Sequence, residues 1–154
     1  MDRGEETKDL DQTDVKILEN LLDDARASNR QIARRIGVSV GTVIAKTRRM
    51  EESGIIKGYS AILDHEKLGY ELTVVTEITV SKGKLVEMER AIGKIPNVCA
   101  VYDVTGDIDA IAVAKFKNRG ELSEFTKGLL AMPFIERTNT HVVLTTVKED
   151  HRLT

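Results

Sequence analysis

The short turn Gly37–Ser39 constrains the fold of this chain more than any other stretch of its sequence. A short amphipathic helix precedes the turn, and Ser28 or Asn29 can cap its N-terminus. Glycine accepts the left-handed conformation that closes helices, and a serine two residues later is a natural N-cap for a second helix, which runs to about Ser53. Two short helices joined by so tight a turn are typical of a helix-turn-helix motif.

An earlier amphipathic helix supplies the third side of a small core. Residues 13–25 carry apolar side chains at helical spacing, and their main stripe comprises Val15, Leu18, Leu21 and Leu22. In the helix after the turn, the residues predicted to point inward are Val43, Thr47 and Met50. Gly54 ends that helix, so the first part of the chain is predicted to be a three-helix domain.

The charge of this domain is strongly local. Residues 26–50 contain seven Lys and Arg and no Asp or Glu, although the chain as a whole has 25 acidic and 23 basic residues. A surface that lies on polyphosphate needs cations and avoids carboxylates. The alternative is a plain three-helix core with a solvated basic flank. The combination of motif and charge favours binding to double-stranded DNA.

Positions within the motif predict different roles in DNA binding. The first turn and outer side of the recognition helix normally reach base edges in the major groove, whereas peripheral arginines contact phosphates and position the protein. The predicted base readers are Val40, Gly41, Thr42, Ala45, Lys46 and Arg49, with Ser39 at the N-cap. The predicted phosphate contacts are Arg26, Arg30, Arg34 and Arg48. Glycine is unusual inside a helix, and at position 41 it is either a sign of close approach to DNA or simply tolerated.

The rest of the chain has the pattern of an α+β domain. Residues 55–63 are predicted to be extended, and residues 64–69 a polar turn. Later segments alternate as strand, helix, strand, strand, helix and strand, the ferredoxin-like βαββαβ order. We therefore expect a DNA-binding domain over residues 1–54, a hinge strand and linker over 55–69, and a second domain over 70–154. A sheet with apolar residues on both faces calls for a partner, so this second domain is predicted to form homodimers.

Composition excludes several other classes of protein. The chain of 154 residues is 41% hydrophobic, and its apolar runs are far shorter than the roughly 20 residues of a membrane span. The acidic, polar start is not a signal peptide, so we expect a cytoplasmic protein without membrane contact. A single cysteine, Cys99, is predicted to be a buried small side chain and cannot form an internal disulfide. No metal-ligand spacing or nucleophile–base pair is present in the sequence, and no cofactor is expected.

Taken together, these segments resemble the Lrp/AsnC family, the feast/famine transcriptional regulators of bacteria and archaea. The similarity runs from Leu10 to about Lys148 and includes "LDQTDVKIL", "DDARASNRQIARRIGVSVGTV", "MEESGIIKGYSAILDHEKLG" and "VTGDIDAIAVAKFKNRGELSEF". The resemblance implies a winged-type helix-turn-helix domain tethered to a sensing domain. It also implies dimers that assemble further, into tetramers or octamers, and small amino-acid effectors bound between dimers.

The loop between the two middle strands is the predicted effector site. Gly106 lets the backbone approach a bound molecule, and Asp107 and Asp109 can pair with an α-ammonium group. Thr138 and Thr140 on the last strand can complete a polar pocket. An ordinary hairpin turn is the alternative, since the same residues are common turn formers. By resemblance, the residues that match the family's effector loop are Tyr102, Gly106, Asp107 and Asp109.

The sequence also departs from the family pattern and leaves an alternative function to weigh. Lys46 and Thr47 stand where the family commonly has Arg then Ile, so operator sequence cannot be transferred. Some chains of regulator-like fold act as tetrapyrrole-processing decarboxylases that use basic and histidine side chains. Here His65, His141 and His151 fall in separate segments, which favours a regulator over such an enzyme.

Overall fold

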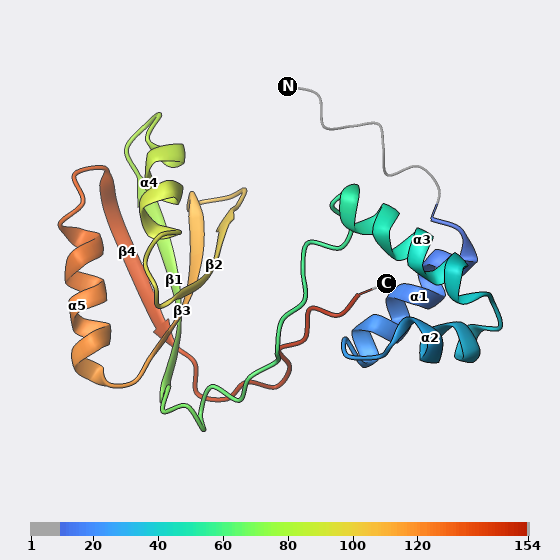
Figure 1. Cartoon of the computed structure of the whole chain (residues 1–154). Helices are drawn as coiled ribbons and strands as arrows, with labels where there is room; N and C mark the ends of the chain where they lie inside the picture. Colours follow the sequence, from blue (N-terminus) through green and yellow to red (C-terminus); the bar gives the residue numbers. More distant parts are fainter. Residues whose placement is uncertain (1–9, 154) are drawn as a thin grey trace. The chain divides into compact units, whose positions relative to one another are not determined.

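The computed structural model describes residues 10–153 (Figure 1). The chain divides into two compact units. The helical unit comprises residues up to 62 together with the segment from residue 150, and the sheet unit comprises residues 63–149. Among the helices of the described residues, none combines the length and apolar character needed to cross a membrane.

Three helices form the first unit, and each begins at a side-chain cap. They are α1 (Gln12–Asp23), α2 (Asn29–Ile36) and α3 (Val40–Glu52). Asp11 and Ser28 each form a capping box, and the Ser39 hydroxyl accepts a hydrogen bond from the Thr42 amide at 3.0 Å. The backbone of Gly37 has φ 76°, the left-handed conformation predicted for the turn. The helix-turn-helix prediction is therefore confirmed.

The core of the helical unit is small and lies where the three helices meet. Its fully buried apolar members are Ile17, Ile32, Ala33, Val43 and Met50. The stripe predicted on the first helix is only half-buried, and that helix ends at Asp23 because Asp24 is extended. Sequence periodicity did not indicate that Asp14 on α1 is buried, yet this residue has no exposed surface.

The second unit is a four-stranded antiparallel sheet with two helices, in the predicted order. Its elements are β1 (Leu72–Val80), α4 (Leu85–Ile92), β2 (Val98–Asp103), β3 (Ala110–Phe116), α5 (Arg119–Leu130) and β4 (Ile135–Val142). The strands lie in the order β2-β3-β1-β4, as Figure 1 shows. Alternate residues of β1 and β3 pack with α4 and α5 into one apolar core, and the ferredoxin-like α+β fold is confirmed.

The opposite face of the sheet carries no helix of this unit. Its centre is apolar and half-buried, at Val75, Ile111 and Val113. Glu77 on this face accepts a hydrogen bond from the Asn139 side chain at 3.1 Å and lies 3.4 Å from His141. We call this surface, with its apolar centre and polar edge, the open face.

Two local predictions differ from the structure. Most of the predicted hinge strand, over residues 57–64, belongs to no strand or helix of the described chain. Cys99 is exposed, not buried. It lies on an edge strand at the shift of register between Val98 and Ala100, where the alternation of the strand is interrupted.

Candidate nucleic-acid interface and sensing loop

Helix α3 turns one face to the core and leaves the other exposed. Val43 and Met50 are fully buried, whereas Gly41, Ala45 and Arg48 are exposed on the opposite side. A Cβ atom added at Gly41 would meet only the Ser39 hydroxyl, at the ordinary contact distance of 3.7 Å. No packing within the described unit therefore accounts for a glycine there, so close approach of another molecule remains a reason for it.

Two apolar side chains lie on the same exposed surface. Val40 is 37% exposed in the first turn, and Ile44 is 49% exposed one turn later. Sequence reasoning included Val40 but missed Ile44, because an isoleucine in an amphipathic helix is normally assigned to the core. Its position next to Ala45, outside the stripe that contains Val43 and Met50, was the available signal. An apolar side chain of this kind can contact a thymine methyl group.

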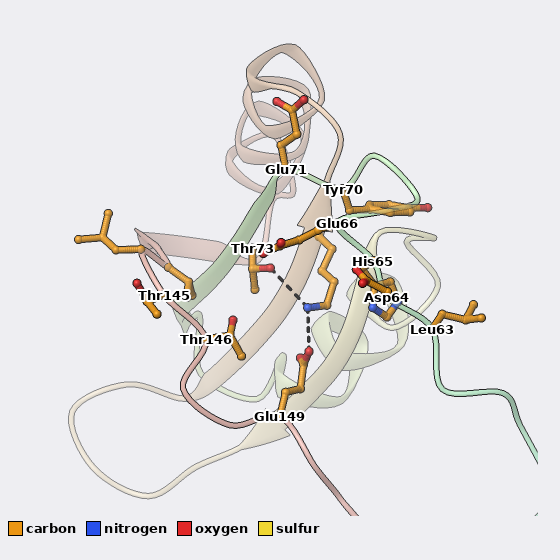
Figure 2. Close-up of a pocket in the computed structure, with 13 residues that line it drawn as sticks. Leu63, Asp64, His65, Glu66, Tyr70, Glu71, Thr73, Thr145, Thr146 and Glu149 are labelled. Carbon is orange, nitrogen blue, oxygen red and sulfur yellow. Dashed lines mark hydrogen bonds and ion pairs between the residues drawn. The ribbon is translucent and has the colours of Figure 1, made fainter.

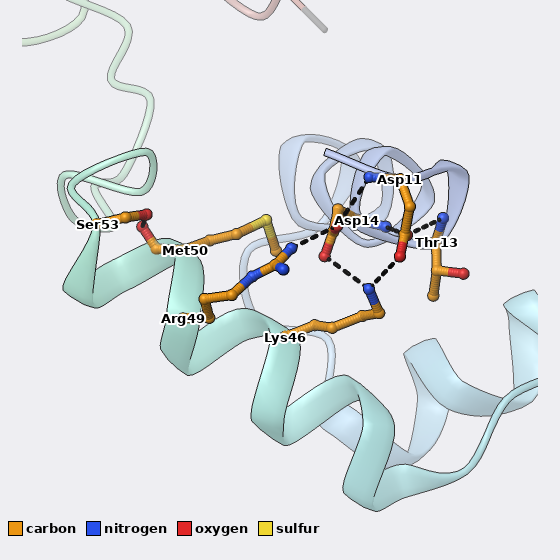
Figure 3. Close-up of polar contacts among 7 residues, drawn as sticks. All are labelled: Asp11, Thr13, Asp14, Lys46, Arg49, Met50 and Ser53. Carbon is orange, nitrogen blue, oxygen red and sulfur yellow. Dashed lines mark hydrogen bonds and ion pairs between the residues drawn. The ribbon is translucent and has the colours of Figure 1, made fainter. Parts of the chain in front are cut away.

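Lys46 and Arg49 are tied to the first helix (Figure 3). The Lys46 ammonium donates to Asp11 and, at 3.2 Å, to the buried carboxylate of Asp14. The Arg49 guanidinium donates to the other oxygen of Asp14 at 2.6 Å. The Asp11 amide also donates to Asp14, at 2.9 Å. One buried carboxylate thus joins the N-terminus of α1 to two cations of α3.

This cluster changes the expected roles of the two cations. The Lys46 side chain is only 20% exposed and lies between α3 and α1, not on the outer side where sequence reasoning placed it. Its hydrogen bond lowers the pKa of Asp11 to about 2 and in return raises the pKa of Lys46. The Arg49 side chain is 56% exposed, so it keeps donors for a further partner. Two aspartates outside the acid-free segment therefore neutralise part of its charge.

The other predicted DNA contacts are exposed or serve as caps. Arg26, Arg30 and Arg34 are exposed on or near α2. Arg48 donates to Glu52 at 2.7 Å, a surface pair with both side chains largely in water, which is weak and easily exchanged. The hydroxyls of Ser39 and Thr42 lie 2.8 Å apart, so both take part in the cap at the start of α3.

The predicted effector loop joins β2 to β3 at one end of the sheet. Gly106 has φ 128°, which favours glycine, and Asp107 beside it is exposed. Asp109 has a structural contact instead: its carboxylate accepts from the Val80 amide at 2.8 Å. The Asp109 amide donates to the Ile78 carbonyl at 3.0 Å, so this residue fastens the loop to β1. Of the two aspartates, Asp107 is the more accessible.

The remaining predicted effector residues divide between the two faces of the sheet. Tyr102 is 50% exposed and pairs with Ile111, a residue of the open face. Thr138 and Thr140 pair with Ile78 and Thr76, which lie on the face that packs against the helices. Thr140 is also within hydrogen-bonding distance of the Thr76 hydroxyl, at 3.1 Å. A single chain therefore does not bring the six predicted residues into one cavity.

Comparison with known proteins agrees with both units. A winged helix-turn-helix DNA-binding domain matches residues 10–57, and the Lrp/AsnC ligand binding domain matches residues 73–153. The chain belongs to the Lrp/AsnC family. It is 47% identical over 144 residues to an HTH-type transcriptional regulator of Pyrococcus abyssi, covering 94% of this chain and 98% of that protein.

Two further relatives have names that state a ligand. The leucine-responsive regulatory protein of Escherichia coli is 32% identical over 150 residues, which cover 95% of this chain and 92% of that one. A transcriptional regulator of Neisseria meningitidis, solved as a complex with L-Met, aligns with a TM-score of 0.88 and 26% identity over 95% of this chain and 97% of that one. These findings give no support to the tetrapyrrole decarboxylase alternative.

The structure also places the histidines that an enzyme of that kind would use. His65 lies in the turn before β1, His141 on β4 and His151 in the segment that belongs to the helical unit. Within residues 10–153, no group of three or more His, Cys, Asp or Glu is arranged to hold a metal ion.

Proposed function

We propose that this Lrp/AsnC family member binds double-stranded DNA sequence-specifically with α3 in the major groove and regulates transcription. The observation that carries the proposal is the exposed side of α3, where Val40, Gly41, Ile44 and Ala45 leave a shallow surface with Arg48 and Arg49 beside it. Small and apolar side chains allow close approach to base edges, and arginines at the border can contact phosphates or guanines. Arg26, Arg30 and Arg34 extend the basic surface along α2.

The proposal assigns different roles to the three cations of α3. Arg48 exchanges its weak pair with Glu52 for a phosphate oxygen. Arg49, which Asp14 holds at one nitrogen, presents its remaining donors in a fixed direction and is the best candidate for a bidentate contact. Lys46 positions α3 on α1 and contributes little to DNA directly. Ser39 and Thr42 act by capping the helix that reads the bases.

The second part of the proposal concerns the effector and the assembly. We propose that an amino acid or related small molecule tunes assembly or DNA affinity, as the names of the Escherichia coli and Neisseria meningitidis relatives suggest for those proteins. Asp107 is the proposed ammonium partner. Because Tyr102 and the threonines of β4 lie on different faces, a complete site needs residues from more than one chain. Residues 1–54 would then bind DNA, 55–69 link, and 70–154 sense and dimerise, with tetramers or octamers built from dimers. A regulatory role of this kind requires no catalytic site or cofactor.

One DNA-binding assay tests the proposal. Fluorescence anisotropy over a range of salt concentrations, on a duplex selected from random DNA, should give a steep fall of affinity with salt. Arg34→Ala and Arg48→Ala should each flatten the slope of log affinity against log salt by about 0.9, one phosphate contact. Lys127→Ala removes the same charge from α5 and should leave the slope unchanged.

The same assay, repeated with each common amino acid, tests the effector. At least one should shift the binding curve, and Asp107→Ala should remove that shift without weakening binding in its absence. Slopes that stay the same in both arginine variants would exclude the assigned DNA surface. A curve that no amino acid moves would exclude the effector class.

A further inference from the structure

Lys115 is one of two buried charged residues among the described residues, and the function proposed above does not use it. It lies near the end of β3, with its side chain only 8% exposed. Its ammonium donates to the Glu149 carboxylate at 3.0 Å and lies 3.4 Å from the Thr73 hydroxyl (Figure 2). A buried ammonium is costly unless an anion accompanies it. A negatively charged partner therefore stabilises the ammonium at this position.

A polar cavity of about 530 Å³ surrounds this ion pair. Thr73 and Lys115 line it from the sheet, residues 63–71 from the segment before β1, and Thr145, Thr146 and Glu149 from the segment after β4. Figure 2 shows labelled residues from all three parts, among them His65, Thr73 and Glu149, around this cavity. The volume is within the range of small-molecule sites.

The walls of the cavity are held by specific contacts. The Asn97 carbonyl accepts from the Lys115 amide and the Asn97 side chain donates to the Lys115 carbonyl, both at 2.9 Å. On the other side, the Tyr70 amide donates to the His65 carbonyl at 2.9 Å, and the two rings meet edge to face at 5.9 Å. The Lys117 ammonium lies 5.5 Å from the centre of the Tyr70 ring. The backbone of Lys115 and the segment that carries Tyr70 are thus each held by specific contacts.

The cavity and the proposed effector loop lie at opposite ends of the sheet. Thr73 and Lys115 are directly paired, one residue from the start of β1 and one from the end of β3. The loop that contains Asp107 leads into Ala110, at the other end of β3, and its Asp109 bonds to the last residue of β1. Five further residue pairs of β1 and β3, from Val74 and Ala114 to Ile78 and Ala110, lie between the Thr73–Lys115 pair and this loop. The cavity is therefore distinct from the proposed effector loop.

The present partner of Lys115 is carried by a segment that little else holds. Val143 still bonds to Thr73, but residues 143–149 form no helix or strand. Leu144 and Val147 are 96% and 94% exposed, and the Glu149 side chain is 43% exposed. Few buried contacts favour local opening. Because Glu149 lies on this weakly held segment, the carboxylate of a small molecule can replace it as the partner of Lys115.

Acidic side chains at the edge of the cavity determine which carboxylate-bearing molecules can bind there. Glu66 and Glu71 line the cavity, and neither has an ion-pair partner among the described residues. Asp64 is held by Lys67 at 3.0 Å. A simple anion would meet like charge at this rim, whereas a molecule that also carries an amine would pair with it. We propose that this cavity is a second ligand site, which binds a small zwitterion: its carboxylate replaces Glu149 on Lys115 and Thr73, and its ammonium faces Glu66 and Glu71.

Binding at this site has a defined structural consequence. The carboxylate can reach Lys115 only when Glu149 leaves, so the ligand releases residues 143–149. It also contacts residues 63–71, the segment through which the chain enters the sheet from the helical unit. The ligand and the C-terminal segment are thus mutually exclusive, and an intramolecular competitor lowers the apparent affinity of the ligand.

Calorimetric titration of the full chain tests this competition. Glycine, β-alanine and 4-aminobutyrate are suitable probes, since they span a range of separations between amine and carboxylate, and propionate is the matched control for β-alanine. Glu149→Gln removes the competitor and should bind at least one of the three about tenfold or more tightly than the wild type, the effect of losing one charge-assisted hydrogen bond. Propionate should bind more weakly than β-alanine. Adding Lys115→Gln to Glu149→Gln should abolish binding.

Two further measurements keep the test decisive. If the double variant does not fold, Thr73→Val in the Glu149→Gln background should weaken binding severalfold. Asp107→Ala should leave it unchanged, which separates this site from the effector loop. In the wild type, saturating probe should speed hydrogen exchange of residues 143–149. The proposal is overturned if Glu149→Gln binds no zwitterion more tightly than the wild type, or if binding survives the loss of Lys115.

Discussion

Asp14 offers the sharpest test of how the helical unit is held together. Its carboxylate is fully buried and accepts hydrogen bonds from Arg49, Lys46 and the Asp11 amide. Asp14→Ala removes all three acceptor contacts at once. We expect this single change to loosen α3 from α1 without affecting the sheet unit.

The expected loss of stability depends on whether each hydrogen-bond partner of Asp14 keeps another contact in the variant. Hydrogen bonds to charged groups contribute about 1.5–3 kcal/mol each. Lys46 retains Asp11, and Arg49 is 56% exposed and can turn to water, so neither cation is left buried and unpaired. The full penalty for breaking a buried ion pair, about 3–5 kcal/mol, is therefore not reached. We estimate a loss of about 3 kcal/mol for Asp14→Ala and about half of that for Asp14→Asn, which keeps one acceptor oxygen.

Native-state hydrogen exchange measures this loss in the intact chain. A loss of about 3 kcal/mol corresponds to roughly a hundredfold faster exchange of amides that open with the helical unit, such as those of residues 43–50. Amides of β1 serve as an internal reference and should not change. Glu19→Ala is the matched control, because Glu19 is exposed on the same helix and has no ion pair within the described residues.

The result that would refute this reasoning is simple to recognise. If Asp14→Ala speeds exchange of α3 less than threefold, the buried carboxylate is not what couples α3 to α1. Equal effects of Asp14→Ala and Glu19→Ala would lead to the same conclusion.

Two other predictions concern charge and assembly. The pKa of Asp11 is about 2 in the folded chain, below its ordinary 3.8, so its pair with Lys46 stabilises the helical unit above about pH 4 and is lost as the pH falls from about 4 toward 2. An NMR titration of the Asp11 carboxyl should show this midpoint, and Lys46→Met should raise it; an unchanged midpoint in that variant contradicts the assignment. Val113→Glu places a charge at the apolar centre of the open face and should shift the chain from dimers to monomers in light scattering, whereas Glu124→Gln on α5 should not. A dimer that survives Val113→Glu would mean that the chain associates through another surface.

Local chemistry made most of the fold predictable. Ser28, Gly37 and Ser39 each have a conformational or capping preference that depends on near neighbours only, and all three perform the predicted role. The alternation of β1 likewise gave its buried face, because one face of that strand is covered. Cys99 shows the limit of this reasoning: its exposure depends on which strand lies at the sheet edge and where the register shifts.

The candidate site was harder to read, because its charges are paired across long stretches of chain. An acid-free segment of 25 residues does not make an acid-free surface, since Asp11 and Asp14 reach it from α1. Periodicity marked Asp14 as polar without indicating that it is buried. In the same way, nothing in the sequence near Lys115 indicates Glu149 as its partner, 34 residues later. Contacts of this kind depend on tertiary structure, which no local pattern contains.

Helix α3 is capped at its N-terminus and held to α1 by ion pairs, and this affects the heat capacity change expected when the protein binds DNA. Asp14 on α1 accepts hydrogen bonds from Lys46 and Arg49 on α3. Rotation of α3 about its axis would break these bonds and leave the buried carboxylate without its cations. The helical unit is therefore already ordered before it binds DNA. The heat capacity change of binding then reports mainly the surface buried in the complex, because α3 does not fold on binding. If two chains bind two DNA half-sites, we expect any adjustment to the spacing of those half-sites to come from the residues between α3 and the sheet.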